Sequence, residues 1–242
     1  MWDYIINFNH RNWKSVLATI LCCLCIKIHS QEIYQFGLLP NISLSDELGE
    51  HWRLSSSIES RQILKEGAFH QPKNFGYQYL LTDVTTIFSK KVNNTSSYGG
   101  GYLLRLEDRR IMHRFIQQVL FKTTYRTFKL SHRFRTDQSF EHSDVPEFRF
   151  RYRLSMEFPL NGKVLNLKEF YFRLNSEGLN KFKSGYSLET RLVPLLGYTI
   201  SKKQRFEFGL DYRMGSLLSR DQTNHKFWLK FNYYCKLEKR GN

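Results

Sequence analysis

The sequence predicts an all-β chain folded as a single antiparallel transmembrane-type β-barrel, with about ten to twelve strands and a charge-lined lumen. The first observation is the alternation from Phe148 to Phe158, in which apolar side chains occupy every even position and Arg149, Arg151 and Arg153 lie among the odd ones. Because successive side chains of a strand point to opposite faces, this segment has one apolar face and one cationic face.

The second observation is the composition. Aromatic residues make up 16% of the 242 residues, yet the mean hydropathy is −0.50. Strands that face lipid on one side and a wet interior on the other produce this combination. A polytopic helical membrane protein is excluded, because each of its helices would need about 20 mostly apolar residues. A large soluble β-sandwich with apolar inner faces is the alternative architecture.

Strand signals bounded by turn-forming residues follow one another along the first half of the chain. They predict six strands: Tyr34–Leu44, ended by an Asp-Glu-Leu-Gly turn; Trp52–Ile63, ended by a polar loop; Tyr77–Lys90, ended by Val-Asn-Asn-Thr; Ser97–Leu106, which contains three consecutive glycines; Ile111–Thr123; and Thr127–Asp137.

The second half shows the alternation more clearly and predicts five further strands. Bacterial barrels of the outer membrane have an even number of strands. We therefore expect ten or twelve, with either one strand added to these eleven segments or the first segment outside the wall. The five segments are Phe148–Phe158, ended by an Asn-Gly turn; Val164–Asn175, ended by a polar loop; Gly185–Ile200, ended by Ser-Lys-Lys-Gln; Arg205–Met214; and His225–Leu237.

The connections and the last segment also resemble those of outer-membrane barrels. Short turns alternate with longer polar loops through most of the chain, which is typical of barrels with short periplasmic turns and longer external loops. In the last segment Phe227, Leu229, Phe231 and Tyr233 share one face, as in the final strand by which such barrels are recognised by the barrel assembly machinery.

The N-terminus resembles a secretory signal peptide, and we assign residues 1–30 to it and residues 31–242 to the barrel. Arg11 and Lys14 supply a positive region, Ser15–Ile26 supplies an apolar stretch, and Ser30 marks the expected boundary. Twelve residues are too few to span the hydrocarbon as a helix. An uncleaved anchor or a buried core helix is the alternative. Export of a barrel predicts the outer membrane of a Gram-negative bacterium.

The charge and the cysteine content limit which partners and cofactors the protein is expected to have. The formal net charge is +15, and an exported chain meets anionic lipid head groups or lipopolysaccharide rather than nucleic acid. Cys235 is the one cysteine beyond residue 30, and no Cys/His spacing indicates a metal site. We expect no cofactor and no metal.

Several motifs resemble a known family. They include Glu59-Ser60-Arg61, His132-Arg133-Phe134-Arg135, the 148–154 segment, Glu169-Phe170-Tyr171-Phe172 and Glu189-Thr190-Arg191. Together with the closing strand, they are similar to the uncharacterised outer-membrane barrel proteins known as domain of unknown function 2490, which are common in Bacteroidetes-type bacteria. The resemblance covers nearly all of residues 31–242. It implies a barrel and an outer-membrane location, and it implies no activity and no catalytic residues.

Charged side chains on the polar faces of the predicted strands are the candidate lumen-lining residues. They pair across strands and fill the interior, or they form a basic conduit or pocket for a small or lipidic anion, since guanidinium groups suit carboxylate and phosphate. The candidates are Arg133, Arg135, Arg149, Arg151, Arg153, Glu157, Glu169, Glu189, Arg191, Glu207, Asp211 and Arg213.

No catalytic motif is present, so we expect a structural or channel-like role rather than an enzyme. Two alternatives remain: an outer-membrane lipid-modifying enzyme, and a soluble periplasmic binding protein. An enzyme of the first kind would use a His-Ser-acid group near the rim, and the candidates are His113, His132, His142, His225, Ser131, Ser139 and Ser143.

Overall fold

The computed structural model describes residues 33–69, 75–108, 110–141, 144–217 and 223–237. The predicted signal peptide, residues 1–30, lies outside the described residues. In the described part of the chain no helix is long and apolar enough to cross a membrane. Eleven strands are formed: β1 (Ile33–Leu48), β2 (Trp52–Ala68), β3 (Gln78–Lys91), β4 (Ser96–Glu107), β5 (Arg110–Thr124), β6 (Lys129–Glu141), β7 (Glu147–Pro159), β8 (Phe170–Phe182), β9 (Tyr186–Thr199), β10 (Gln204–Gly215) and β11 (Asn224–Lys236).

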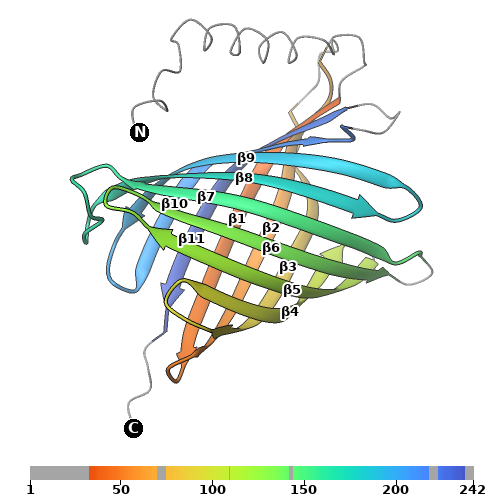
Figure 1. Cartoon of the computed structure of the whole chain (residues 1–242). Coiled ribbons are helices and arrows are strands. Elements are labelled where there is room, and N and C mark those ends of the chain that lie inside the picture. Colours follow the sequence, from red (N-terminus) through yellow and green to blue (C-terminus); the bar gives the residue numbers. More distant parts are fainter. Residues whose placement is uncertain (1–32, 70–74, 109, 142–143, 218–222, 238–242) are drawn as a thin grey trace, which may run out of the picture. The chain divides into compact units, whose positions relative to one another are not determined.

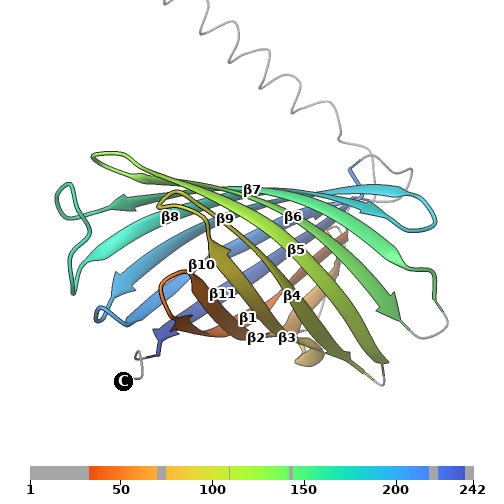
Figure 2. The same cartoon turned by 60° about the horizontal axis from the view of Figure 1, so that its bottom comes forward.

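The strands close into one barrel in chain order (Figures 1 and 2), which confirms the predicted all-β barrel class. Every sequential pair is antiparallel, whereas β1 and β11 close the barrel as a parallel pair running from Ile33↔Asn224 to Ser45↔Lys236. The expectation of ten or twelve strands is wrong, because β1 is a full wall strand of 16 residues. An odd number of alternating strands makes the first and last parallel, and a parallel ladder still satisfies their backbone groups.

The connections between the strands lie at the two ends of the barrel. We call the end where β1 and β11 begin the N-end, and the end where they finish the C-end. The predicted alternation of short turns at one end and long loops at the other is not found. The two longest connections lie at opposite ends: residues 69–77 at the N-end and residues 160–169 at the C-end.

Ten predicted strands overlap the observed ones closely, and β8 is the exception. The predicted segment 164–175 is displaced, because residues 160–169 form a connection in which Asn166 donates two hydrogen bonds to Glu169. The strand instead continues through Ser176, Gly178 and Asn180, which occupy its outward face. Their polarity interrupts the apolar alternation, so this stretch resembles a loop in the sequence.

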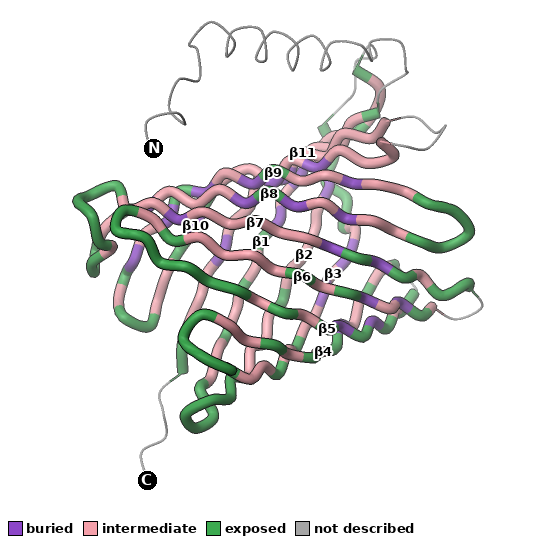
Figure 3. Tube along the Cα trace, viewed as in Figure 1, coloured by how far each residue is buried: buried purple, intermediate pink, exposed green. Residues whose placement is uncertain are grey.

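Burial alternates along the strands, as Figure 3 shows. On β7, Phe148 is 54% and Phe150 is 42% exposed, whereas Arg149 is 8% exposed. On β10, Phe206 and Phe208 are exposed while Glu207 is completely buried. The polarity is therefore the reverse of a soluble protein: apolar groups face outward and ionic groups face the interior. A small apolar cluster of Leu39, Ile63 and Trp228 also lies inside.

Glycine allows a buried aromatic ring to lie flat against the wall on β8 and β9. Gly197 is paired with Tyr171, and a Cβ atom at residue 197 would collide with the Tyr171 ring. The Tyr171 hydroxyl donates a hydrogen bond of 2.8 Å to Glu207, which is itself completely buried. Gly197 therefore fixes both the ring and the carboxylate that it contacts.

The change Gly197→Ala is expected to lower the free energy of unfolding by about 1–3 kcal/mol, because the added methyl group over-packs the interior. Denaturant unfolding of the refolded protein in detergent, followed by tryptophan fluorescence, measures the effect. Gly178→Ala is the matched control, since no atom lies within 4 Å of a Cβ there. Equal effects of the two changes would show that the Tyr171 contact is unimportant.

Candidate functional site: the barrel interior

Two adjoining cavities occupy the interior of the barrel. The first has a volume of about 440 Å³, is lined by side chains from all eleven strands and lies toward the N-end. The second has a volume of about 530 Å³ and lies toward the C-end. We call them the N-end chamber and the C-end chamber. They share Arg133, Arg135, Arg153, Asp211 and Lys230, among other residues, so the chambers meet at this level.

The structure places every candidate lumen residue except Glu169 on the lining of at least one chamber. Strand parity explains this placement, because side chains two residues apart share a face. Glu169 precedes β8 and lies in the connection at the C-end, where its carboxylate accepts hydrogen bonds from Asn166.

Arginines face one another across β6 and β7. Arg133 lies opposite Arg153, and Arg135 lies opposite Arg151. Like charges in directly opposed positions of a sheet are destabilising. The pairing therefore requires negative charge from neighbouring strands or from a ligand.

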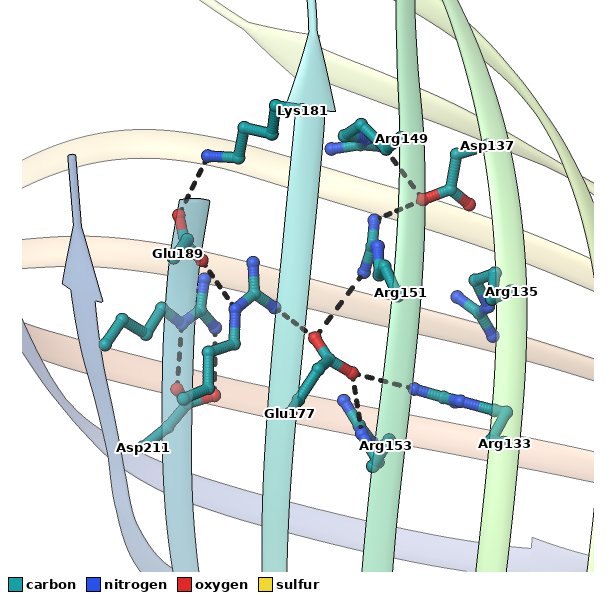
Figure 4. Close-up of polar contacts among 12 residues, drawn as sticks. Arg133, Arg135, Asp137, Arg149, Arg151, Arg153, Glu177, Lys181, Glu189 and Asp211 are labelled. Carbon is teal, nitrogen blue, oxygen red and sulfur yellow. Dashed lines mark hydrogen bonds and ion pairs between the residues drawn. The ribbon is translucent and has the colours of Figure 1, made fainter. Parts of the chain in front are cut away.

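Glu177 on β8 supplies much of that charge (Figure 4). Its side chain is 1% exposed, and its Oε2 lies 2.8 Å from Arg153 Nε and 3.2 Å from Arg133 Nη2. Its Oε1 lies 3.3 Å from Arg191 Nη1 and 4.0 Å from Arg151 Nη1. One carboxylate thus contacts four guanidinium groups contributed by β6, β7 and β9.

A second group of ion pairs lies on β8, β9 and β10. Arg213 donates two hydrogen bonds, of 2.8 and 2.9 Å, to the carboxylate of Asp211. Glu189 accepts from Arg191 at 2.6 Å and from Lys181 at 2.8 Å. Such charge-assisted pairs hold the side chains in fixed positions along this wall.

Two carboxylates organise the C-end chamber. Glu157 contacts Arg173 at 2.5 Å and Lys129 at 3.4 Å. Glu207 accepts hydrogen bonds of 3.1 Å from Asn232 and from Tyr234. Glu207 also forms an ion pair of 2.5 Å with Arg173. Its charge is therefore fully satisfied without solvent.

Positive charge exceeds negative charge in both chambers. Thirteen Arg or Lys side chains line the N-end chamber against four Asp or Glu, and eight line the C-end chamber against three. Arg114, Arg135 and Lys226 form no ion pair with a carboxylate among the described residues. Arg135 donates to Gln118, and Arg114 donates to Ser139 and Met112. The described carboxylates thus compensate the cations only in part.

Comparison with known proteins adds a family assignment. Residues 36–234 match the family model described as "Protein of unknown function (DUF2490)". The chain belongs to this family. No curated protein and no solved structure matches it. Membership in DUF2490 confirms the resemblance found in the sequence.

Sequence reasoning on this DUF2490 chain missed several residues of the interior, among them Asp83, Arg105, Arg114 and Glu177. Asp83 accepts hydrogen bonds of 2.7 and 2.8 Å from Arg105, so the two residues compensate each other. These residues could have been identified from strand parity, because inward-facing side chains recur at every second position of a strand. Glu177 keeps the parity of Arg173 if β8 is continued beyond residue 175, and the displaced prediction for that strand hid it.

The structure separates the candidate catalytic residues of the DUF2490 chain. His113 is hydrogen-bonded to Tyr102, and His132 to Tyr152, on the outward face of the wall. Ser139 lies inside and accepts a hydrogen bond of 2.8 Å from Arg114. His142 and Ser143 lie outside the described residues. Among the described residues no group of three or more His, Cys, Asp or Glu side chains is arranged to hold a metal ion.

An exposed ion pair lies beyond the strands at the N-end of the DUF2490 barrel. Lys183, after β8, donates a hydrogen bond to Asp144, after β6. This hydrogen bond, with a second from the Val145 amide, holds the pKa of the Asp144 carboxyl below its usual range. The same contact raises the pKa of Lys183. Both groups are therefore charged at neutral pH at this rim.

Proposed function

We propose that this protein is an outer-membrane β-barrel whose cationic interior binds small anions and lets them pass between its two ends. The observation that carries the proposal is the reversed polarity of the wall: the strands present apolar groups to the outside, and every strand from β2 to β11 presents ionic groups to the chambers.

The outer face supports insertion in a bilayer. Large apolar side chains are exposed on every strand from β1 to β10, and Phe227, Leu229 and Phe231 lie on the outward face of β11. Continuous apolar surface of this extent is rare on soluble monomers. The strands have 12 to 17 residues, which is more than the 9–11 or so that a tilted strand needs to cross the hydrocarbon.

The same features, together with the predicted signal peptide, support an outer-membrane location. An exported barrel with an apolar belt is inserted in the outer membrane of a Gram-negative bacterium, where lipopolysaccharide and other lipids contact its outer face. Insertion there would use the barrel assembly machinery, and the aromatic alternation of β11 suits that role.

The interior supports the choice of anions. An excess of Arg and Lys over Asp and Glu in a confined, low-dielectric space attracts anions and repels cations. The guanidinium group offers a planar fork of donors that matches carboxylate or phosphate oxygens. Because the two chambers share residues, an anion bound in one lies next to the other.

The proposal predicts anion-selective conductance in planar bilayers. Under a KCl gradient, the reversal potential of the wild-type protein is expected to have the sign of chloride permeation. Arg133→Gln and Arg153→Gln, which remove charge where the chambers meet, should shift the potential toward zero. Arg53→Gln, at an exposed C-end position paired with Glu47, is the matched control and should leave it unchanged. A folded, inserted protein that gives no channels, or that prefers potassium, would contradict the proposal.

A further inference from the structure

The N-end chamber contains a buried guanidinium group with no acidic partner. Arg114 on β5 is 2% exposed. Its Nε donates a hydrogen bond of 2.8 Å to the Ser139 hydroxyl, and its Nη2 lies 3.1 Å from the sulfur of Met112, a weak acceptor. No carboxylate of the described residues lies within ion-pair distance of it. A buried cation without a counter-ion is costly, so this position favours a bound anion.

Arg149 on β7 presents further unused donors. The residue is 8% exposed. Its Nη2 lies 3.4 Å from Asp137 and its Nε lies 3.3 Å from Glu147. Neither contact has the geometry of a hydrogen bond, and both nitrogens are buried without a hydrogen-bond partner. Arg149 therefore has donor nitrogens that no hydrogen bond within the described residues uses, beside the Arg114 guanidinium that has no carboxylate partner.

The register brings these groups to one region of the wall. Arg114 is paired with Ser139 on β6, and Arg149 is paired with Asp137, two residues before Ser139. Both arginines line the N-end chamber. The same short stretch of β6 thus separates the two guanidinium groups.

Positive charge is in excess around these two arginines. The N-end chamber that they line has thirteen Arg or Lys side chains against four Asp or Glu, and Arg114 itself has no carboxylate partner among the described residues. A chloride or a single carboxylate supplies one negative charge. A dianion with several oxygens supplies two and accepts several charge-assisted hydrogen bonds.

We propose that the N-end chamber carries a binding site for a phosphate dianion, either inorganic phosphate or the terminal phosphate of a small monoester, held by Arg114 and Arg149. A phosphate group fits the fork of donors on both guanidinium groups. The chamber volume of about 440 Å³ lies within the range of about 300–1,000 Å³ found for small-molecule sites, which leaves room for an organic part. This inference rests on the proposed anion-binding interior and adds a ligand class and a position.

Calorimetric titration of the full chain, refolded in detergent, tests the site. Inorganic phosphate is expected to bind saturably at pH 7.5 and to raise the unfolding temperature. Arg114→Gln and, separately, Arg149→Gln should weaken phosphate binding about tenfold or more, as expected for the loss of one charge-assisted contact. Arg53→Gln, at the opposite end of the barrel, is the matched control. Chloride at equal ionic strength should not reproduce the effect.

The second ligand, glycerol phosphate, identifies the source of the phosphate group. Binding of both ligands with similar affinity assigns the site to the phosphate alone, and tighter binding of glycerol phosphate assigns the organic part to the chamber. Absence of saturable binding by both ligands, or unchanged affinity in both arginine variants, would overturn the inference. Anion-selective conductance together with absent phosphate binding would remove this site alone, whereas phosphate binding without conductance would remove the passage between the ends.

Discussion

Replacing Glu177 by Gln is expected to lower the free energy of unfolding by about 3–5 kcal/mol, the cost of breaking a buried ion pair by removing one partner. The side chain is 1% exposed, so solvent cannot take over its role. Arg133 and Arg153, which face each other across β6 and β7, would lose the carboxylate oxygen that lies between them. Denaturant unfolding in detergent micelles measures the loss.

Glu169→Gln is the matched control for this charge removal. Glu169 lies in the connection before β8 and bonds Asn166, so its replacement is expected to change the free energy of unfolding by about 0.5 kcal/mol or less. The double variant Glu177→Gln with Arg133→Gln should recover part of the loss, because it removes one of the stranded cations. Equal stability of Glu177→Gln and Glu169→Gln would contradict the role assigned to Glu177.

Replacing Leu192 by Arg is expected to destabilise the barrel in liposomes by about 2–4 kcal/mol, the cost of a cation on the lipid face at the bilayer midplane. Leu192 is 46% exposed and lies at the middle of β9. It lies on the outward face opposite Ser176 and Tyr212. Unfolding by denaturant in liposomes gives the free energy.

Position along the strand provides the control for Leu192→Arg. Tyr186 is the first residue of β9 and is 43% exposed, so Tyr186→Arg should cost only about 0–1 kcal/mol near the interface. The apolar change Leu192→Met should cost little. If Leu192→Arg is as stable as wild type, the outer face lies in water. That result would contradict the membrane barrel and favour the alternative of a soluble periplasmic protein.

The sequence was sufficient for the parts of the fold that depend on side-chain alternation. In β7, and in β10 from Phe206 onward, each outward position is apolar and most inward positions are charged. The strand, its two faces and the inward direction of Arg151 and Asp211 therefore follow from parity alone. Ten strands were placed in this way, and the family assignment agrees with the motifs that those strands carry.

Features that depend on three-dimensional closure could not be predicted. The alternation of β1 does not indicate that its second neighbour is β11. The two strands are far apart in the sequence: Asn41 and Asn232, which are in contact, are separated by 191 positions. The partners of the β6 and β7 arginines could not be found while β8 was displaced, because Ser176, Gly178 and Asn180 face outward and conceal the strand. The balance of positive and negative charge depends on side chains from all the strands that surround the interior, so it cannot be predicted from the sequence of one strand.

The parallel seam between β1 and β11 has a consequence for anything attached to the protein. The first residue of β1 and the last residue of β11 are separated by the height of the wall. In the proposed membrane barrel, reporters fused at these two positions would therefore lie in different compartments. A circularly permuted variant, which most domains tolerate through a short joining peptide, would here need a tether as long as the wall is high.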